Sequence, residues 1–186
     1  WNPQGTRIML ILRWRPSSGG NTKNYLITLT PDLGEIHMPI DAQRWRDGHH
    51  PNWCPDGDTI IMNLAYDNKR GIWGRMSTLA ARVAKRVGVR YFSDARVLRF
   101  STFRYDGTEF AIAAPSHFGS GHPSMHKDGK HIVTDAYISE RVAFRNGDVP
   151  IRIINTETDK VVSSLRVGTK PAFSGPRQEL RIDPHP

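Results

Sequence analysis

The sequence predicts an all-β protein built from the blades of a β-propeller, and three observations lead to this prediction. A motif recurs, because "GHHPNWCPDGDTIIMNL" from Gly48 onward is followed 72 positions later by "SGHPSMHKDGKHIVTDAY". In each copy an Asp-Gly pair precedes a short apolar run, a pattern typical of a β-hairpin. Each repeat also contains about four strand-like runs, which is the number of strands in a propeller blade.

The register of the repeat sets the expected blade boundaries. Aligning Asp56 with Asp128 superposes His50 on His122, and a shift of 52 positions places Gly5 on Gly57. The next step, from His122 to His185, is 63 positions. Periods of this size indicate a solenoid, a propeller or an array of repeats. We therefore expect blade 1 at about 1–49, blade 2 at about 50–121, blade 3 at about 122–182 and the start of a next blade at 183–186.

The strands are expected where β-branched and aromatic residues cluster between turns. These runs lie at 7–12, 24–29, 35–40, 59–65, 97–103, 108–114, 131–137, 149–155 and 160–167. Asp-Gly favours a type I′ turn, in which both central residues have positive φ. The second repeat carries an insertion, "STLAARVAKRVG", whose Leu79, Val83 and Val87 share one helical face. This spacing predicts a short basic helix near 78–87.

Composition narrows the classes of function. A formal net charge of +8 favours anionic partners, although no long run of like charges is present. No apolar run reaches the length that spans a membrane, and no nucleic-acid-binding motif, phosphate-binding loop or serine-nucleophile motif occurs. The single cysteine, Cys54, excludes an intrachain disulfide. We interpret Cys54 as a small core residue rather than a nucleophile.

Histidines at equivalent positions are the strongest candidate site. The first strand of a propeller blade lines the central channel, so His50, His122 and His185 are expected to converge on the axis. Converging imidazoles suit a divalent ion such as zinc, manganese, iron or nickel. The alternative is structural: His-Pro starts a strand, with proline fixing φ and histidine bonding a neighbouring backbone group.

Other residues receive weaker predictions. His117, in the loop before the innermost strand of the third repeat, is expected to lean over the channel mouth as a substrate-binding residue. Asn63 and Asp135 align near strand ends and are expected to form hydrogen bonds across blades. Trp1, Trp53 and Met125 align as inward core residues. The remaining histidines are interpreted as rim, strand or turn residues: His37, His49, His126 and His131.

Four segments carry a resemblance to a known family. "HHPNWCPDGDTIIMNL", "GHPSMHKDGKHIVTDAY", "IRIINTETDK" and "ELRIDPHP" resemble the WD40-like repeats of TolB-like propellers, and more closely those of oligogalacturonate lyase. The resemblance implies a three-blade part of a seven-bladed propeller that β-eliminates acidic uronate oligosaccharides. It also implies manganese, held by histidines and a glutamine. His50, His122 and His185 resemble the channel histidines, whereas neither the glutamine nor the proposed basic arginine can be matched.

Two further expectations follow from the resemblance. It implies an anionic oligosaccharide as partner and a bacterial cytoplasmic or periplasmic location, without choosing between these two. The alternative function is a non-catalytic TolB-like propeller that acts as a binding or scaffold module. Because three blades do not close a ring, and ring closure protects sheet edges, we expect either a two-fold dimer or further blades that complete the ring.

Overall fold

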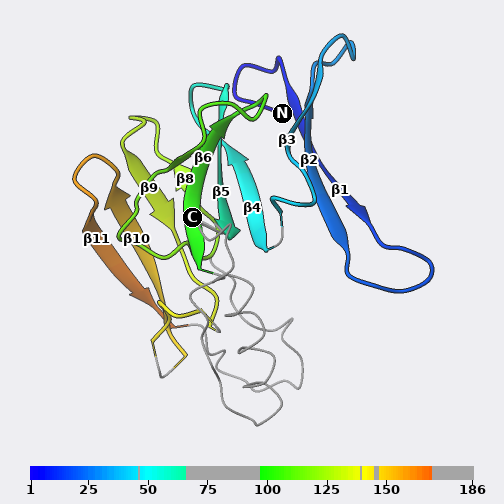
Figure 1. Ribbon diagram of the computed structural model, residues 1–186. Helices are drawn as coiled ribbons and strands as arrows, with labels where there is room; N and C mark the ends of the chain where they lie inside the picture. The colour runs from blue at the N-terminus through cyan, green and yellow to red at the C-terminus, as the bar shows by residue number, and fades with distance from the viewer. Residues whose placement is uncertain (46, 66–96, 139, 145–146, 169–186) are drawn as a thin grey trace, which may run out of the picture.

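The computed structural model describes residues 1–45, 47–65, 97–138, 140–144 and 147–168. Within these ranges the regular structure consists of eleven strands in three antiparallel sheets, which stand side by side like propeller blades (Figure 1). The all-β prediction is confirmed. The helix expected near 78–87 lies outside the described residues, and the described ranges contain no helix. None of these ranges therefore offers a helix able to cross a membrane.

Each sheet is formed by strands that follow one another in the chain. The first sheet has the order β1 (Ile8–Trp14), β2 (Lys23–Leu29) and β3 (Ile36–Ile40). The second contains β4 (Gly48–Trp53), β5 (Thr59–Ala65), β6 (Leu98–Arg104) and β7 (Ala111–Ile112). The third contains β8 (Ser124–Met125), β9 (His131–Thr134), β10 (Val149–Asn155) and β11 (Lys160–Val167). All nine runs expected from the sequence contain an observed strand.

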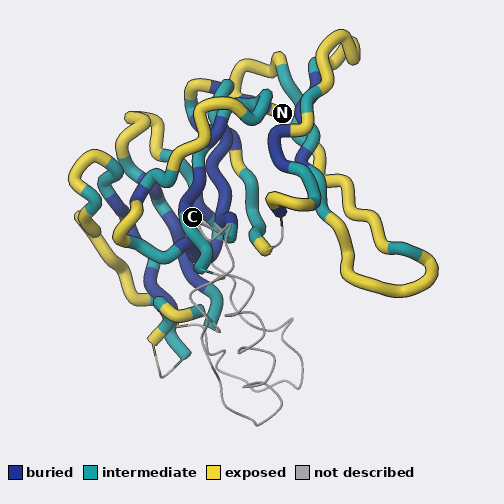
Figure 2. Tube along the Cα trace, in the orientation of Figure 1, coloured by how far each residue is buried: buried dark blue, intermediate teal, exposed yellow. Residues whose placement is uncertain are grey.

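Two hydrophobic clusters join the three sheets. One lies between the first and second sheets, where Leu26 and Ile40 pack near Ile60 and Met62. The other lies between the second and third sheets and includes Ile61 of β5. Successive side chains of a strand point to opposite faces, so β5 supplies both clusters. Accordingly β5 and β6 are largely buried, whereas β1 and β11 are exposed (Figure 2).

The Asp-Gly turns differ from the expected type I′. Gly57 and Gly129 have φ of 75° and 70°, but neither preceding aspartate has positive φ. Instead, each glycine N–H donates to the carbonyl three residues earlier, and each aspartate side chain accepts backbone N–H groups that follow it. The aspartate thus stabilises the turn through its side chain, so one left-handed residue is sufficient.

The prediction that the three aligned residues face the core is confirmed for two of them. Trp53 is buried in the first cluster, and Met125 packs against the second. The prediction is wrong for Trp1, which is 68% exposed. Asn2 and Gln4 hold this N-terminal segment to the turn at Pro55, Asp56 and Gly57 through side-chain hydrogen bonds, while the Trp1 side chain remains in solvent. Strands β1 and β3 of the first sheet also expose Leu10, Leu12, Ile36 and Met38.

Cys54 is predicted to react very slowly with thiol reagents. It is buried in the second cluster, as the sequence predicted, and burial raises the pKa of its thiol to about 12. Relative to a pKa of 9.0, this shift reduces the thiolate fraction near neutral pH on the order of 10³-fold. Labelling with a chromogenic disulfide at pH 8 should be slow in buffer and fast in denaturing urea. Rapid labelling of the folded chain would contradict the burial of Cys54.

Candidate functional site at the inner strands

Two of the predicted histidines meet between the second and third sheets. His50 lies in β4, and His122 lies two residues before β8. Their ring centroids are 3.9 Å apart, with the planes inclined at 61°. The repeat register therefore brings into contact two side chains that are 72 positions apart in the sequence. The third predicted histidine, His185, lies outside the described residues.

A tyrosine hydroxyl joins the two imidazoles. The Tyr137 hydroxyl oxygen lies 2.7 Å from Nε2 of His50 and 2.9 Å from Nε2 of His122. Tyr137 follows β9, so it connects the third sheet to the second. Both Nε2 atoms therefore face one point in space. Tyr137 was not among the predicted site residues; its only signal in the sequence is its place two positions after Asp135, at the end of an apolar run.

A buried carboxylate holds the other side of His122. Asp135 is 0% exposed, and its carboxylate accepts the backbone N–H of His122 at 2.5 Å. Its two oxygens also lie 2.9 and 3.1 Å from Nδ1 of His122. Because an ionised carboxylate only accepts hydrogen bonds, the proton of neutral His122 lies on Nδ1. The lone pair of Nε2 is then directed at the Tyr137 hydroxyl.

The backbone of β4 is distorted where it presents His50. The pairing of β4 with β5 has a register irregularity between His49 and Asn52, and His50 has φ of 55°. A non-glycine residue in this left-handed region costs on the order of 1–3 kcal/mol, and such residues cluster at functional sites. Bulges of this kind redirect a side chain relative to a regular strand. Here the redirected side chain is the one that meets His122.

Glu140 and His49 border the pair. Glu140 accepts backbone N–H groups from Tyr137 at 2.7 Å and from Gly121 at 3.0 Å. Burial raises the pKa of Glu140, and burial lowers the pKa of His49, whose Nε2 lies 3.8 Å from a Glu140 oxygen. Low solvent exposure therefore favours the neutral form of both groups. His49, interpreted as a rim residue, is half-buried beside the site.

Gly121 is predicted to be essential for the position of Asp135. It has φ of 44°, and a methyl group there would collide with the Asp135 carboxylate and backbone. Gly129 has φ of 70° but no atom within 4 Å of an added methyl group, so it is a matched control. Gly129→Ala should cost about 1 kcal/mol of unfolding free energy and Gly121→Ala at least about twice that. Urea unfolding measures both, and equal losses would contradict the packing around Gly121.

The other predicted residues lie elsewhere. His117 Nε2 is 3.1 Å from the backbone oxygen of Asp159, in the β10–β11 turn. Its substrate-binding role stays a prediction. Asn63 donates from Nδ2 to the carbonyls of Ser120 and Gly121, each at 2.8 Å; both carbonyls belong to the connection from β7 to β8 and lie within the bounds expected for blade 2. Asp135 likewise bonds His122 within its own repeat.

Comparison with known proteins supports the fold. No protein-family model matches the chain, and no curated protein matches it. Among solved structures, TolB from Acinetobacter baumannii matches with a TM-score of 0.50 and 15% identity over 84% of this chain and 29% of that one. An acylaminoacyl peptidase from Pyrococcus horikoshii matches with 0.52 and 11% identity over 90% and 24%.

A third solved structure, an oligogalacturonate lyase in complex with manganese, matches with a TM-score of 0.43 and 14% identity. It covers 86% of this chain and 39% of that one, and nothing is concluded from a similarity this low. The chain thus spans well under half the length of each of these three proteins. At these identities the comparisons show fold alone. The chain has a β-propeller fold similar to that of TolB.

Proposed function

We propose that His50 and His122 form part of a divalent-metal centre through which this propeller binds an anionic oligosaccharide. One observation carries the proposal: the Nε2 atoms of His50 and His122 both face the Tyr137 hydroxyl oxygen, at 2.7 and 2.9 Å respectively. The resemblance of the His-Pro repeats to those of oligogalacturonate lyase supports manganese as the ion and a uronate chain as the ligand.

The residues present fit such an ion. Metal-binding histidines usually donate their second ring N–H to a carboxylate, which fixes the tautomer and raises the basicity of the ligating nitrogen. Asp135 stands in that relation to His122, at 2.9 Å. The Tyr137 oxygen adds a third donor atom beside the two nitrogens. A bound ion would neutralise the carboxylate of a uronate ligand and so favour loss of the neighbouring proton in β-elimination.

The chain's own residues would orient this ligand. Asp135 keeps the His122 ring in place, and the left-handed backbone of His50 directs the second ring to the same point. The Tyr137 hydroxyl can donate a hydrogen bond to an anionic oxygen. The formal net charge of +8 attracts an acidic chain over longer distances. No residue is assigned as the base that removes the proton.

The alternative is a scaffold in which these contacts are structural. Its support is that Tyr137 already satisfies both imidazoles and connects two sheets through hydrogen bonds. In that case the site stabilises the contact between blades, and binding takes place on another surface. The two functions differ in what the histidines bind, so metal titration separates them.

Replacing both histidines should weaken the binding of manganese by this chain. We expect calorimetric titration of the 186-residue chain to show manganese binding that weakens at least about tenfold in the His50→Ala, His122→Ala double variant. His37→Ala is the control, since His37 lies in β3 of the first sheet. Formation of an unsaturated product from oligogalacturonate would establish the lyase reaction. Equal manganese binding by wild type and double variant would favour the scaffold.

A further inference from the structure

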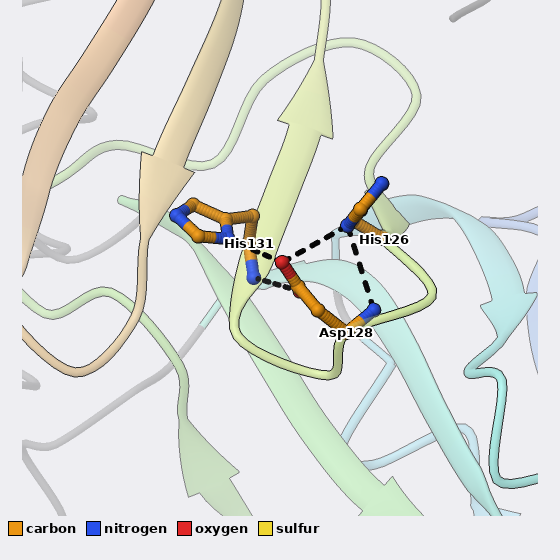
Figure 3. Close-up of side chains that lie close together, drawn as sticks. All are labelled: His126, Asp128 and His131. Atoms are coloured by element: carbon orange, nitrogen blue, oxygen red, sulfur yellow. Dashed lines mark hydrogen bonds and ion pairs between the residues drawn. The ribbon is translucent and has the colours of Figure 1, made fainter.

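A second group of metal-binding side chains surrounds the β8–β9 hairpin (Figure 3). His126 follows β8, Asp128 lies in the turn, and His131 begins β9. Nδ1 of His126 and Nδ1 of His131 lie 3.0 and 2.7 Å from Oδ2 of Asp128. We propose that these three residues form a separate site for a borderline divalent ion such as zinc. It lies beyond the opposite end of β8 from His122 and does not depend on the function proposed above.

The donor set selects the class of ion. The three ligand atoms lie within 4.8 Å of one another. Two imidazole nitrogens and one carboxylate oxygen suit zinc or nickel, whereas magnesium and calcium prefer oxygen ligands. Three protein ligands also leave a coordination position for water or for a ligand from solution. His126 and Asp128 are exposed, so an ion can reach them from solvent.

The turn holds the carboxylate in place before any ion binds. Asp128 Oδ1 accepts the backbone N–H groups of Lys130 and His131 at 2.8 and 3.2 Å, which leaves Oδ2 facing the imidazoles. These contacts, led by the Lys130 N–H, hold the pKa of Asp128 below its usual value and keep it charged.

His126 directs Nδ1 toward Oδ2 of Asp128. A longer contact of 3.4 Å joins Nδ1 of His126 to the Asp128 backbone N–H. The same nitrogen lies 3.0 Å from Asp128 Oδ2. In the absence of an ion a proton on Nδ1 accounts for this contact, and a bound ion would replace that proton between the same two atoms.

The side chain of Asn155 disfavours ion binding at His131, so substitutions of Asn155 provide a sensitive test. Its Nδ2 lies 3.1 Å from Nε2 of His131, while its Oδ1 accepts the backbone N–H groups of Glu157 and Thr158. The amide thus donates to Nε2, which places the His131 proton on Nδ1, where the ion would bind. An ion at Nδ1 moves that proton to Nε2, where it faces the donor of Asn155. Asn155→Asp removes this conflict, because it keeps one oxygen for the turn and offers the other to Nε2–H.

The test is zinc titration in the His50→Ala, His122→Ala background, in which the first site is removed. We expect this chain to bind one equivalent of zinc, and addition of His126→Ala and His131→Ala to abolish binding. Asn155→Asp should tighten binding about tenfold, the scale of effects that outer carboxylates have on metal affinity. Asn155→Ala, which removes the opposing donor without adding an acceptor, should produce a smaller gain.

Three results would overturn the proposal. They are absence of zinc binding in the background chain, zinc binding that survives loss of His126 and His131, and Asn155→Asp binding no tighter than its parent. Circular dichroism of each variant verifies that the β-structure is retained. Because His50 and His122 are absent throughout, failure here leaves the function proposed for them unaffected.

Discussion

Asp135→Ala is expected to lower the free energy of unfolding by about 3 kcal/mol. The carboxylate is 0% exposed and bonds both the backbone N–H and Nδ1 of His122. Its removal leaves two donors in a poorly solvated space, and an unsatisfied buried donor costs on the order of 1–3 kcal/mol. Urea unfolding followed by tryptophan fluorescence measures the change. A loss below about 1 kcal/mol would contradict the part assigned to Asp135.

Asp135→Asn separates stability from metal binding. The asparagine oxygen can still accept the His122 backbone N–H, so the loss of stability should be about 1 kcal/mol. Its Nδ2 group, however, donates toward Nδ1 of His122 and so moves the ring proton to Nε2. A protonated Nε2 does not ligate an ion, so manganese binding should fall at least about tenfold. Unchanged manganese affinity in Asp135→Asn would exclude Nε2 of His122 as a ligand.

Phe100→Ala is expected to cost about 3–5 kcal/mol, the usual range for a buried phenylalanine. Phe100 is 0% exposed and lies in the cluster shared by the second and third sheets, near Ile61, Ile132 and Ile154. The control is Phe144→Ala, because that ring is 37% exposed and lies under the guanidinium of Arg166, 4.6 Å from the ring centroid. We expect Phe144→Ala to cost less than about 1 kcal/mol.

The Phe100 substitution also tests how the site is held. His50 and His122 belong to different sheets, and the Phe100 cluster joins these sheets. A weaker cluster should therefore increase motion between the two imidazoles and weaken manganese binding. Similar unfolding free energies for Phe100→Ala and Phe144→Ala would show that the second and third sheets are not packed as described.

Local sequence patterns were sufficient to predict the strands and their grouping into blades. The runs at 24–29, 59–65 and 149–155 contain strands with bounds within one residue of those predicted. Strand formation in these runs depends on β-branched and apolar residues between turns, which is information carried by neighbouring positions. The repeat register also placed His50 beside His122, because equivalent positions in consecutive blades lie at the same height along the inner strands.

Other features required the tertiary structure. The residue type of Tyr137 does not reveal that its hydroxyl lies between two imidazoles, because that position depends on how the second and third sheets pack. The left-handed backbone of His50 is equally hidden, since local preference disfavours it before proline and only the surrounding structure maintains it. The exposure of Trp1 likewise differs from that of Trp53, the residue aligned with it in the repeat.

The sequence by itself determined the all-β class, the repeat and the pairing of His50 with His122, because these follow from periodicity and composition. Only the tertiary structure decided which groups complete each site. The Asp135 carboxylate turns toward His122, and the ligand atoms of His126, Asp128 and His131 gather around one turn. Side-chain directions at such points depend on turn geometry and on contacts between sheets, and neither is encoded in the spacing of residue types along the chain.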